Sequence, residues 1–203
     1  LQENGNLASG VSKAFAAAML ESGRDVQTTA ELIDQGKLDF GSAAGKFAPG
    51  DILKKETELA RNAITLLHES RKRKQEKQKK FGIPKQPWRY MIVATGNIYE
   101  DRTQAKAAAF AGSDIIAVIR STAQSLLDYL PYGATTEGFG GTFATQENFA
   151  IMRKALDEAS EENGRYIRLV NYASGLCMAE IAACAAMEDL DMLLNDSMYG
   201  ILF

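Results

Sequence analysis

The sequence predicts an α/β protein that contains about the first four units of a (β/α)8 TIM barrel, preceded by a helical accessory region. Two observations support this class. After residue 81, short apolar segments with strand character alternate with helical segments, as in a barrel or a doubly wound sheet. Polar residues follow these apolar segments directly, where parallel sheets place their ligands. A doubly wound open sheet is the alternative, although no GxGxxG fingerprint follows the first strand.

Composition narrows the class of protein. The chain has 203 residues, of which 46% are hydrophobic and 24% charged, as in ordinary soluble globular proteins. A net charge of −3 argues against a general nucleic-acid binder. Cys177 and Cys184 fit no zinc spacing and indicate a reducing compartment, so we expect a cytoplasmic protein. The sequence starts at Leu1 and stops within the apolar run Met198–Phe203, so we expect a piece of a longer protein.

Residues 1–80 form the predicted accessory region. Val11–Leu20 has helical periodicity, and a second short helix is expected from Thr28 to Gly36. Asp51 is expected to cap a long helix that continues into Arg71–Lys80, where seven of ten residues are basic. This basic run favours a solvated helix end whose cations complement the helix dipole. A phosphate or RNA contact is the alternative, but no aromatic residues are interleaved.

Residues 81–203 form the predicted half-barrel, entered through a linker rich in glycine and proline. Repeated strand–helix units imply parallel strands joined by right-handed crossovers, so we expect the strands to be neighbours in chain order. The expected strands are Tyr90–Ala94, Ile115–Ile119, Tyr166–Val170 and Met198–Phe203, and the expected helices are Thr103–Ala111, Gln146–Glu162 and Leu176–Asn195.

Candidate binding residues follow the strands. Arg120 and Ser125 come after the second strand, and an arginine with hydroxyl groups suits an oxyanion such as phosphate. Tyr172 and Ser174 follow the third strand, and Tyr199 lies in the fourth. The carboxyl ends of parallel strands meet at one edge, so these residues should converge there. A solvated loop arginine remains the alternative for Arg120.

This residue set suits a planar phosphorylated aromatic ligand such as pyridoxal phosphate, with its phosphate on the arginine and serine and its ring against tyrosine. The alternatives are a core or rim position for Tyr172 and Tyr199, and a helix N-cap for Ser174. Glu137 lies in a glycine-rich loop and is either a site for a substrate ammonium group or a solvated carboxylate. The sequence shows no paired-carboxylate, Ser/His/Asp, Cys/His or metal constellation.

Three long blocks resemble a known family: IRSTAQSLLDYLPYGATTEGFGGTFATQENFAIMRKALDE, GRYIRLVNYASGLCMAEIA and NDSMYGILF. They closely resemble the α subunit of the D-lysine 5,6-aminomutase family, which depends on adenosylcobalamin and pyridoxal phosphate. Ornithine 4,5-aminomutase is a more distant relative. The resemblance covers nearly the whole chain, with the N-terminal helices as the accessory region of the family.

The resemblance implies a barrel that holds pyridoxal phosphate at its C-terminal mouth. It also implies a smaller β subunit that carries cobalamin and the lysine that binds pyridoxal phosphate. Arg120 and Ser125 match residues around the phosphate, Ser174 matches a serine near the ring nitrogen, and Tyr199 matches a tyrosine that stacks on the ring. Further cofactor- and substrate-binding residues of the family lie beyond Phe203.

The implied reaction is a radical 1,2-amino shift that moves the terminal amino group of D-lysine or β-lysine from carbon 6 to carbon 5. Three alternatives stay open: an ornithine 4,5-aminomutase-like enzyme, a barrel enzyme for another phosphorylated ligand, and a non-catalytic fragment.

Overall fold

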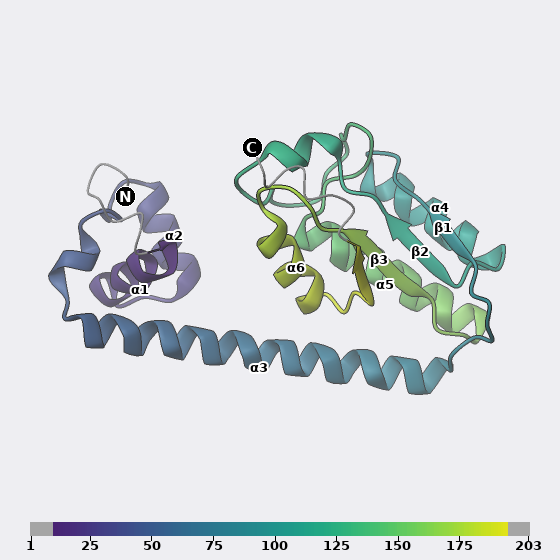
Figure 1. The fold of residues 1–203 in the computed structure, drawn as a ribbon, viewed down its shortest axis with the longest axis horizontal. Coiled ribbons are helices and arrows are strands. Elements are labelled where there is room, and N and C mark those ends of the chain that lie inside the picture. The colour runs from purple at the N-terminus through teal and green to yellow at the C-terminus, as the bar shows by residue number, and fades with distance from the viewer. Residues whose placement is uncertain (1–9, 195–203) are drawn as a thin grey trace. The chain divides into compact units, whose positions relative to one another are not determined.

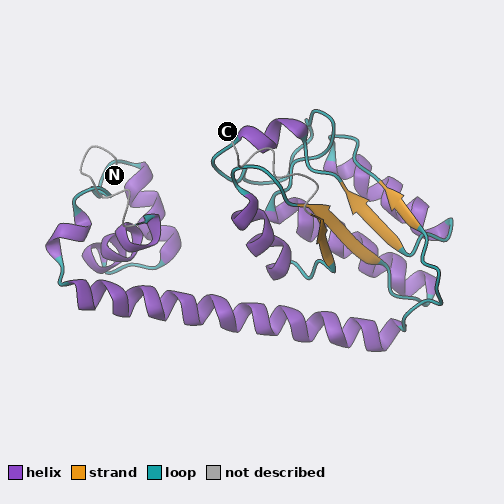
Figure 2. Ribbon diagram, in the orientation of Figure 1, coloured by secondary structure: helices purple, strands orange, loops and turns teal. Residues whose placement is uncertain are grey.

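A computed structural model describes residues 10–194 of the chain (Figures 1 and 2). The chain divides into two compact units, Leu1–Leu66 and Leu67–Phe203. The division falls inside the long helix α3, Pro49–Phe81, so this helix contributes residues to both units. A domain boundary between residues 80 and 81 therefore remains a proposal. Within the described range, no helix combines the length and the apolar character needed to cross a membrane.

The first unit is helical. It contains α1 (Val11–Ser22), α2 (Val26–Asp34), the 3-10 helix η2 (Ala43–Lys46) and the beginning of α3. Gly23 ends α1 in the left-handed conformation, as the sequence predicts. Helix α2 begins earlier than predicted because the Asp25 side chain accepts a hydrogen bond from Thr28 N at 2.8 Å. The core of this unit consists of small alanines and one isoleucine: Ala16, Ala17, Ala18, Ala43 and Ile52.

The second unit contains a sheet of four parallel strands in the order β1-β2-β3-β4. Helices α4, α5 and α6 follow β1, β2 and β3 in the chain (Figure 1). Side chains from all three helices contribute to a buried core on one face of the sheet. This arrangement is part of a (β/α) barrel, and it confirms the predicted fold class. The elements are β1 (Tyr90–Ile92), α4 (Ile98–Phe110), β2 (Ile115–Val118), the 3-10 helix η3 (Thr122–Leu126), α5 (Gln146–Asn163), β3 (Arg168–Tyr172), α6 (Met178–Met187) and β4 (Met192–Leu194).

The fourth strand differs from the sequence prediction. Helix α6 ends at Met187, and β4 lies within the segment that was expected to be helical as far as Asn195. The reason lies at Asp189, which adopts a φ of 58° and so interrupts the helical path. Its buried carboxylate accepts a hydrogen bond from Ser70 Oγ at 2.6 Å. The strand expected at Met198–Phe203 lies outside the described residues.

The third strand begins two residues later than expected. Tyr166 is fully buried, its backbone N–H bonds Gly82 O at 3.0 Å, and its hydroxyl donates to Asp191 Oδ1 at 3.0 Å. Burial raises the pKa of Tyr166, so the phenol stays protonated and remains a donor. Tyr166 therefore holds the chain in place just before β3, whose pairing with β2 begins at Arg168.

The second face of the sheet carries Ile115, Ala117 and Val170, with Trp88, Tyr172 and Met192 packed against them. In a barrel, this face forms the interior layers. Arg168 is 7% exposed, and its guanidinium carbon lies 3.7 Å from the centroid of the Trp88 ring. Stacking on an aromatic face suits a guanidinium because it is planar and weakly hydrated.

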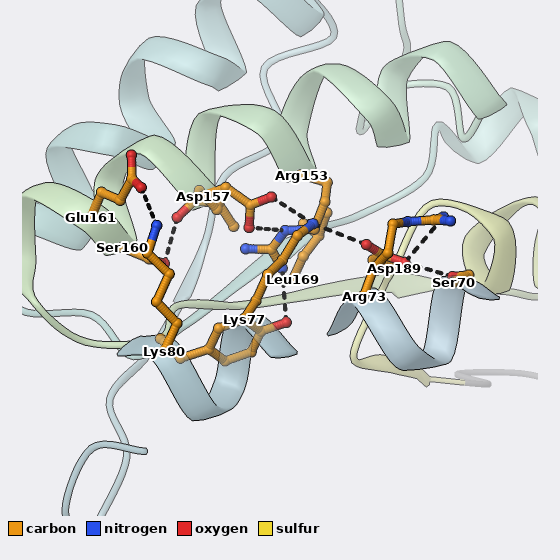
Figure 3. A network of polar contacts seen from close by, with 12 residues as sticks. Ser70, Arg73, Lys77, Lys80, Arg153, Asp157, Ser160, Glu161, Leu169 and Asp189 are labelled. Atoms are coloured by element: carbon orange, nitrogen blue, oxygen red, sulfur yellow. Dashed lines mark hydrogen bonds and ion pairs between the residues drawn. The ribbon is translucent and has the colours of Figure 1, made fainter. Parts of the chain in front are cut away.

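One face of the basic run in α3 pairs with the half-barrel (Figure 3). Lys77 Nζ lies 2.7 Å from an oxygen of Asp157 in α5 and 2.9 Å from one of Asp189, and Lys80 pairs with Glu161. Lys74 Nζ donates to the carbonyl of Leu190 at 2.8 Å. The paired residues recur every three or four positions because these share one side of a helix. The predicted solvated helix end is thus correct for only part of the run.

Beneath this face lies a buried ion pair. Arg153 Nη1 lies 3.2 Å from Asp191 Oδ2, and both side chains are 5% exposed. Arg153 also contacts Asp157 Oδ1 through Nε at 2.9 Å and donates to Ile167 O at 2.9 Å. The guanidinium therefore links α5, the start of β3 and the start of β4.

We expect Arg153→Met to lower the stability of the chain by about 3–5 kcal/mol, because it leaves the buried Asp191 carboxylate without its cation. The measurement is the midpoint of urea unfolding followed by circular dichroism. Lys106→Met is the control, since Lys106 pairs with Glu158 and Glu162 near the surface and its loss should move the midpoint little. Equal shifts for the two variants would contradict a central role of the buried pair.

Candidate functional site

Three of the predicted residues come together at the C-terminal edge of the sheet. Arg120 follows β2, is 8% exposed, and donates from Nη1 to Ser125 Oγ at 2.6 Å. Its second terminal nitrogen, Nη2, donates to Ser174 Oγ. Ser125 lies in η3 and Ser174 in the segment after β3, so the arginine connects the ends of two neighbouring strands. We call these three residues the Arg120 cluster.

Backbone contact fixes the two serines of the cluster relative to each other. Leu176 N donates to Ser125 O at 3.2 Å. Gly175 has a φ of 96°, and a Cβ atom on it would lie 2.7 Å from Ser125 Cα. Only glycine permits this approach, because a side chain there would be both strained and overlapping. The segment after β3 is thereby packed directly on η3.

The glycine-rich loop continues the sheet beside Arg120. Thr142 N donates to Ile119 O at 3.0 Å, and Ser121 N donates to Thr142 O at 3.0 Å. These bonds form a parallel bridge between Arg120 and Thr142. Gly141 is required at this point, since a Cβ atom on it would lie 2.5 Å from the carbonyl oxygen of Ile119. The backbone of Arg120 is therefore held from the side of the loop.

Gln124 clamps the end of the loop. Its Nε2 donates to Ala144 O at 2.8 Å, and its Oε1 accepts from Ala144 N at 2.7 Å. Ser121 Oγ adds a contact at 3.0 Å with the backbone of Phe139. These buried, fully bonded groups give the loop a defined path past the cluster.

The sequence analysis missed a buried acid at this edge. Asp101, in the first turn of α4, is fully buried and accepts from Thr95 N at 2.6 Å and from the Thr142 hydroxyl. The available signal was its helical spacing: Asp101, Ala105 and Ala109 lie four residues apart on the buried side of α4. An acid on an apolar helical stripe indicates a specific buried partner.

The other predicted residues are Tyr172 and Glu137, which the structure describes, and Tyr199, which it does not. Tyr172 packs on the second face of the sheet, and its hydroxyl lies 3.4 Å from that of Tyr90. Burial and the contact with Tyr172 raise the pKa of Tyr90. Glu137 is exposed and forms no ion pair with another described residue. Tyr199 lies outside the described residues.

The donors of the cluster suit a phosphate group. A buried guanidinium is poorly screened by water, and its planar fork with two hydroxyl groups matches the oxygens of an oxyanion. Among residues 10–194, no group of three or more histidine, cysteine, aspartate or glutamate side chains could hold a metal ion. The arrangement therefore favours anion binding at the mouth of the half-barrel.

Comparison with known proteins identifies the family of this chain. The family of the D-lysine 5,6-aminomutase TIM-barrel domain of the α subunit matches residues 1–203. The chain is 52% identical to the lysine 5,6-aminomutase α subunit of Fusobacterium nucleatum subsp. nucleatum and 51% identical to that of Acetoanaerobium sticklandii. Each alignment covers 100% of this chain and 39% of the relative, so the chain spans 39% of the length of these two relatives.

A more distant match is the D-ornithine 4,5-aminomutase subunit β of Acetoanaerobium sticklandii. It is 37% identical over 111 residues, which cover 55% of this chain and 15% of that protein.

We expect Gly175→Ala to destabilise the chain by about 1–3 kcal/mol more than Gly164→Ala, because only the first substitution also forces overlap with a neighbouring backbone. Both glycines have positive φ, 96° and 62°, but a Cβ atom at Gly164 would meet nothing within 4 Å. Urea unfolding of the two variants isolates the cost of the close approach. If both variants lose the same stability, the contact between Gly175 and Ser125 is not tight in solution.

Proposed function

Because the chain belongs to the family of the TIM-barrel domain of the D-lysine 5,6-aminomutase α subunit, we propose that it holds pyridoxal phosphate for a radical 1,2-amino shift. The proposed shift moves the terminal amino group of D-lysine or β-lysine from carbon 6 to carbon 5. The observation that carries this proposal is the Arg120 cluster, a buried cation with two hydroxyl groups at the C-terminal edge of a barrel sheet.

In this proposal, Arg120 and Ser125 bind the phosphate of the cofactor. Ser174 lies beside the ring nitrogen by resemblance to the family, and its hydrogen bond from Arg120 couples the position of the ring to that of the phosphate. Tyr172 and Tyr199 are proposed to contact the ring, and Glu137 the substrate ammonium group.

When bound, pyridoxal phosphate supplies a conjugated system that delocalises an unpaired electron, and adenosylcobalamin supplies the radical that starts the shift. The residues of this chain position the cofactor and exclude water from its site. Ser121 and Gln124 are fully buried and tie the glycine-rich loop to the edge of the sheet, which keeps water from the back of the cluster. Arg120 would hold the phosphate of the cofactor through its guanidinium group.

The segments that build the Arg120 cluster are poor in lysine. Between residue 107 and residue 203 the sequence contains one lysine, Lys154, which is exposed on the middle of α5. The segments that build the cluster therefore contain no lysine that could bind the cofactor aldehyde. We propose that this lysine and the cobalamin come from a smaller β subunit, in a hetero-oligomer.

The substrate assignment rests on the two relatives that are more than half identical, both of which are named for lysine. An ornithine-type substrate is the second candidate, supported by the 37% match to an ornithine 4,5-aminomutase subunit. Both cysteines of the chain are free thiols, which supports a cytoplasmic location for the complex.

We expect Arg120→Ala, tested in the assembled enzyme, to weaken pyridoxal phosphate binding by about 1.5–3 kcal/mol, the scale of a charge-assisted hydrogen bond. This corresponds to a dissociation constant about 10- to 150-fold higher. Titration of the apoenzyme, followed by absorbance of the bound cofactor, gives the constant. Arg102→Ala is the control, because Arg102 is exposed on α4. An affinity that does not change in the Arg120 variant would rule out the phosphate role.

The isolated chain provides a second test. With both cofactors supplied, it should show no turnover of D-lysine. Treatment with pyridoxal phosphate and borohydride should label no single lysine stoichiometrically, because the site segments contain none. Peptide mapping by mass spectrometry reads out the labelled positions. One lysine labelled to completion, or turnover by this chain alone, would point to a self-sufficient pyridoxal phosphate enzyme.

A further inference from the structure

Asp101 is a buried carboxylate that is satisfied without a cation. Its side chain is fully buried, and it forms no ion pair with any described lysine, arginine or histidine. One oxygen accepts from Thr95 N at 2.6 Å and the other from the Thr142 hydroxyl. Burying a carboxylate without hydrogen-bond donors costs free energy. Moving Thr95 N or the Thr142 hydroxyl away from Asp101 would incur this cost, so the carboxylate holds both donors in place.

Thr142 connects Asp101 to the backbone on both sides of Arg120. Its hydroxyl donates to Asp101 and accepts from Gly96 N at 3.0 Å, which uses both functions of the group. Its backbone bonds the residues on either side of Arg120, through Ile119 O and Ser121 N, each at 3.0 Å. A continuous path of hydrogen bonds therefore runs from the buried acid to the backbone that carries the guanidinium.

Glycines allow three segments to pack in direct backbone contact: the turn after β1, the glycine-rich loop and the end of β2. A Cβ atom on Gly96 would lie 2.9 Å from Gly138 O, and one on Gly138 would lie 2.1 Å from Gly141 O. Gly141 in turn lies against Ile119 O, as described above. We call Gly96, Gly138 and Gly141 the glycine stack. Backbones at this separation move together, so a shift of the turn after β1 displaces the end of β2.

We infer that Asp101 is a positioning residue for the anion site, acting through Thr142 on Arg120, so that the guanidinium reaches Ser125 and Ser174 together. This inference rests on the proposed function for the identity of the anion, the phosphate of the cofactor. The side chain of Asp101 is buried, and its hydrogen bonds among the described residues are those with Thr95 N and the Thr142 hydroxyl.

The test is Asp101→Asn in the assembled enzyme. The amide keeps the size of the side chain and one oxygen to accept from Thr95 N, but its NH2 group cannot accept from the Thr142 hydroxyl. We expect the dissociation constant of pyridoxal phosphate to rise about tenfold, the scale of one lost hydrogen bond to a charged group. The ³¹P resonance of the bound cofactor should shift or broaden, since the phosphate is no longer held in one position.

Asp114→Asn is the matched control. Asp114 is also buried, at 6% exposure, and pairs with Arg165 and with Arg89 N before β2, at the opposite edge of the sheet. Its loss should lower the urea midpoint but leave the cofactor affinity and the ³¹P signal unchanged. Equal losses of affinity in the two variants would overturn the inference, because they would report general destabilisation.

Thr142 supplies a second, independent arm. Thr142→Ser keeps the hydroxyl and should bind the cofactor nearly normally, whereas Thr142→Val removes it and should resemble Asp101→Asn. If Asp101 acts through Thr142, Asp101→Asn combined with Thr142→Val should weaken binding no further than either change alone. Multiplied losses in the double variant, or unchanged affinity in both single variants, would overturn the positioning role.

The outcome of Arg120→Ala separates this inference from the proposed function. If Arg120→Ala leaves the affinity unchanged, the phosphate assignment itself fails. If Arg120→Ala weakens binding while Asp101→Asn does not, only the positioning role of Asp101 fails.

Discussion

Parallel pairing of β1, β2 and β3 is the constraint on which the rest of the second unit depends. Because all three strands run the same way, the chain must return through a helix after each of them, and α4 and α5 form the apolar core on one face. The same direction places every strand exit at one edge. Arg120 and Ser174 belong to different strands and are 54 positions apart in the sequence, yet they share a hydrogen bond there. The anion site is thus a product of topology, and no short motif encodes it.

Different kinds of interaction stabilise the two edges of the sheet. At the edge where the strands begin, charged pairs dominate: Arg153 with Asp191, Arg165 with Asp114, and Lys77 with Asp189. At the edge where they end, backbone and side-chain hydrogen bonds, including those of the Asp101 carboxylate, act with glycine contacts to hold the loops around Arg120. This division suits a barrel enzyme, in which one end supplies stability and the other binds the ligand. Asp101 is satisfied by a backbone donor and a hydroxyl donor, and it orders the mouth through Thr142.

The sequence predicts those features that depend on local pattern. Apolar runs ended by polar residues identify β1 to β3 within a few positions, and Arg120, Ser125 and Ser174 follow from what comes after them. Features set by long-range contacts are not predictable in this way. The position of β4 depends on the left-handed turn at Asp189, which is fixed by partners in α3. The pairing of Lys77 and the buried partners of Asp101 likewise depend on segments distant in the sequence. The contact of the Tyr172 hydroxyl with that of Tyr90, 82 positions away, is a further example.

The glycine stack sets a rule for how the length of the mouth loop can change in evolution. Near Gly138 and Gly141, one added residue would break the bridge to Arg120, so this end of the loop should keep its length. The earlier part of the loop is different, since Tyr129 and Tyr132 are 60% and 99% exposed and bear none of the contacts that hold Arg120. Insertions and deletions should therefore collect around these tyrosines. Such changes would let the rim of the mouth diverge among relatives while the anion site behind it keeps its geometry.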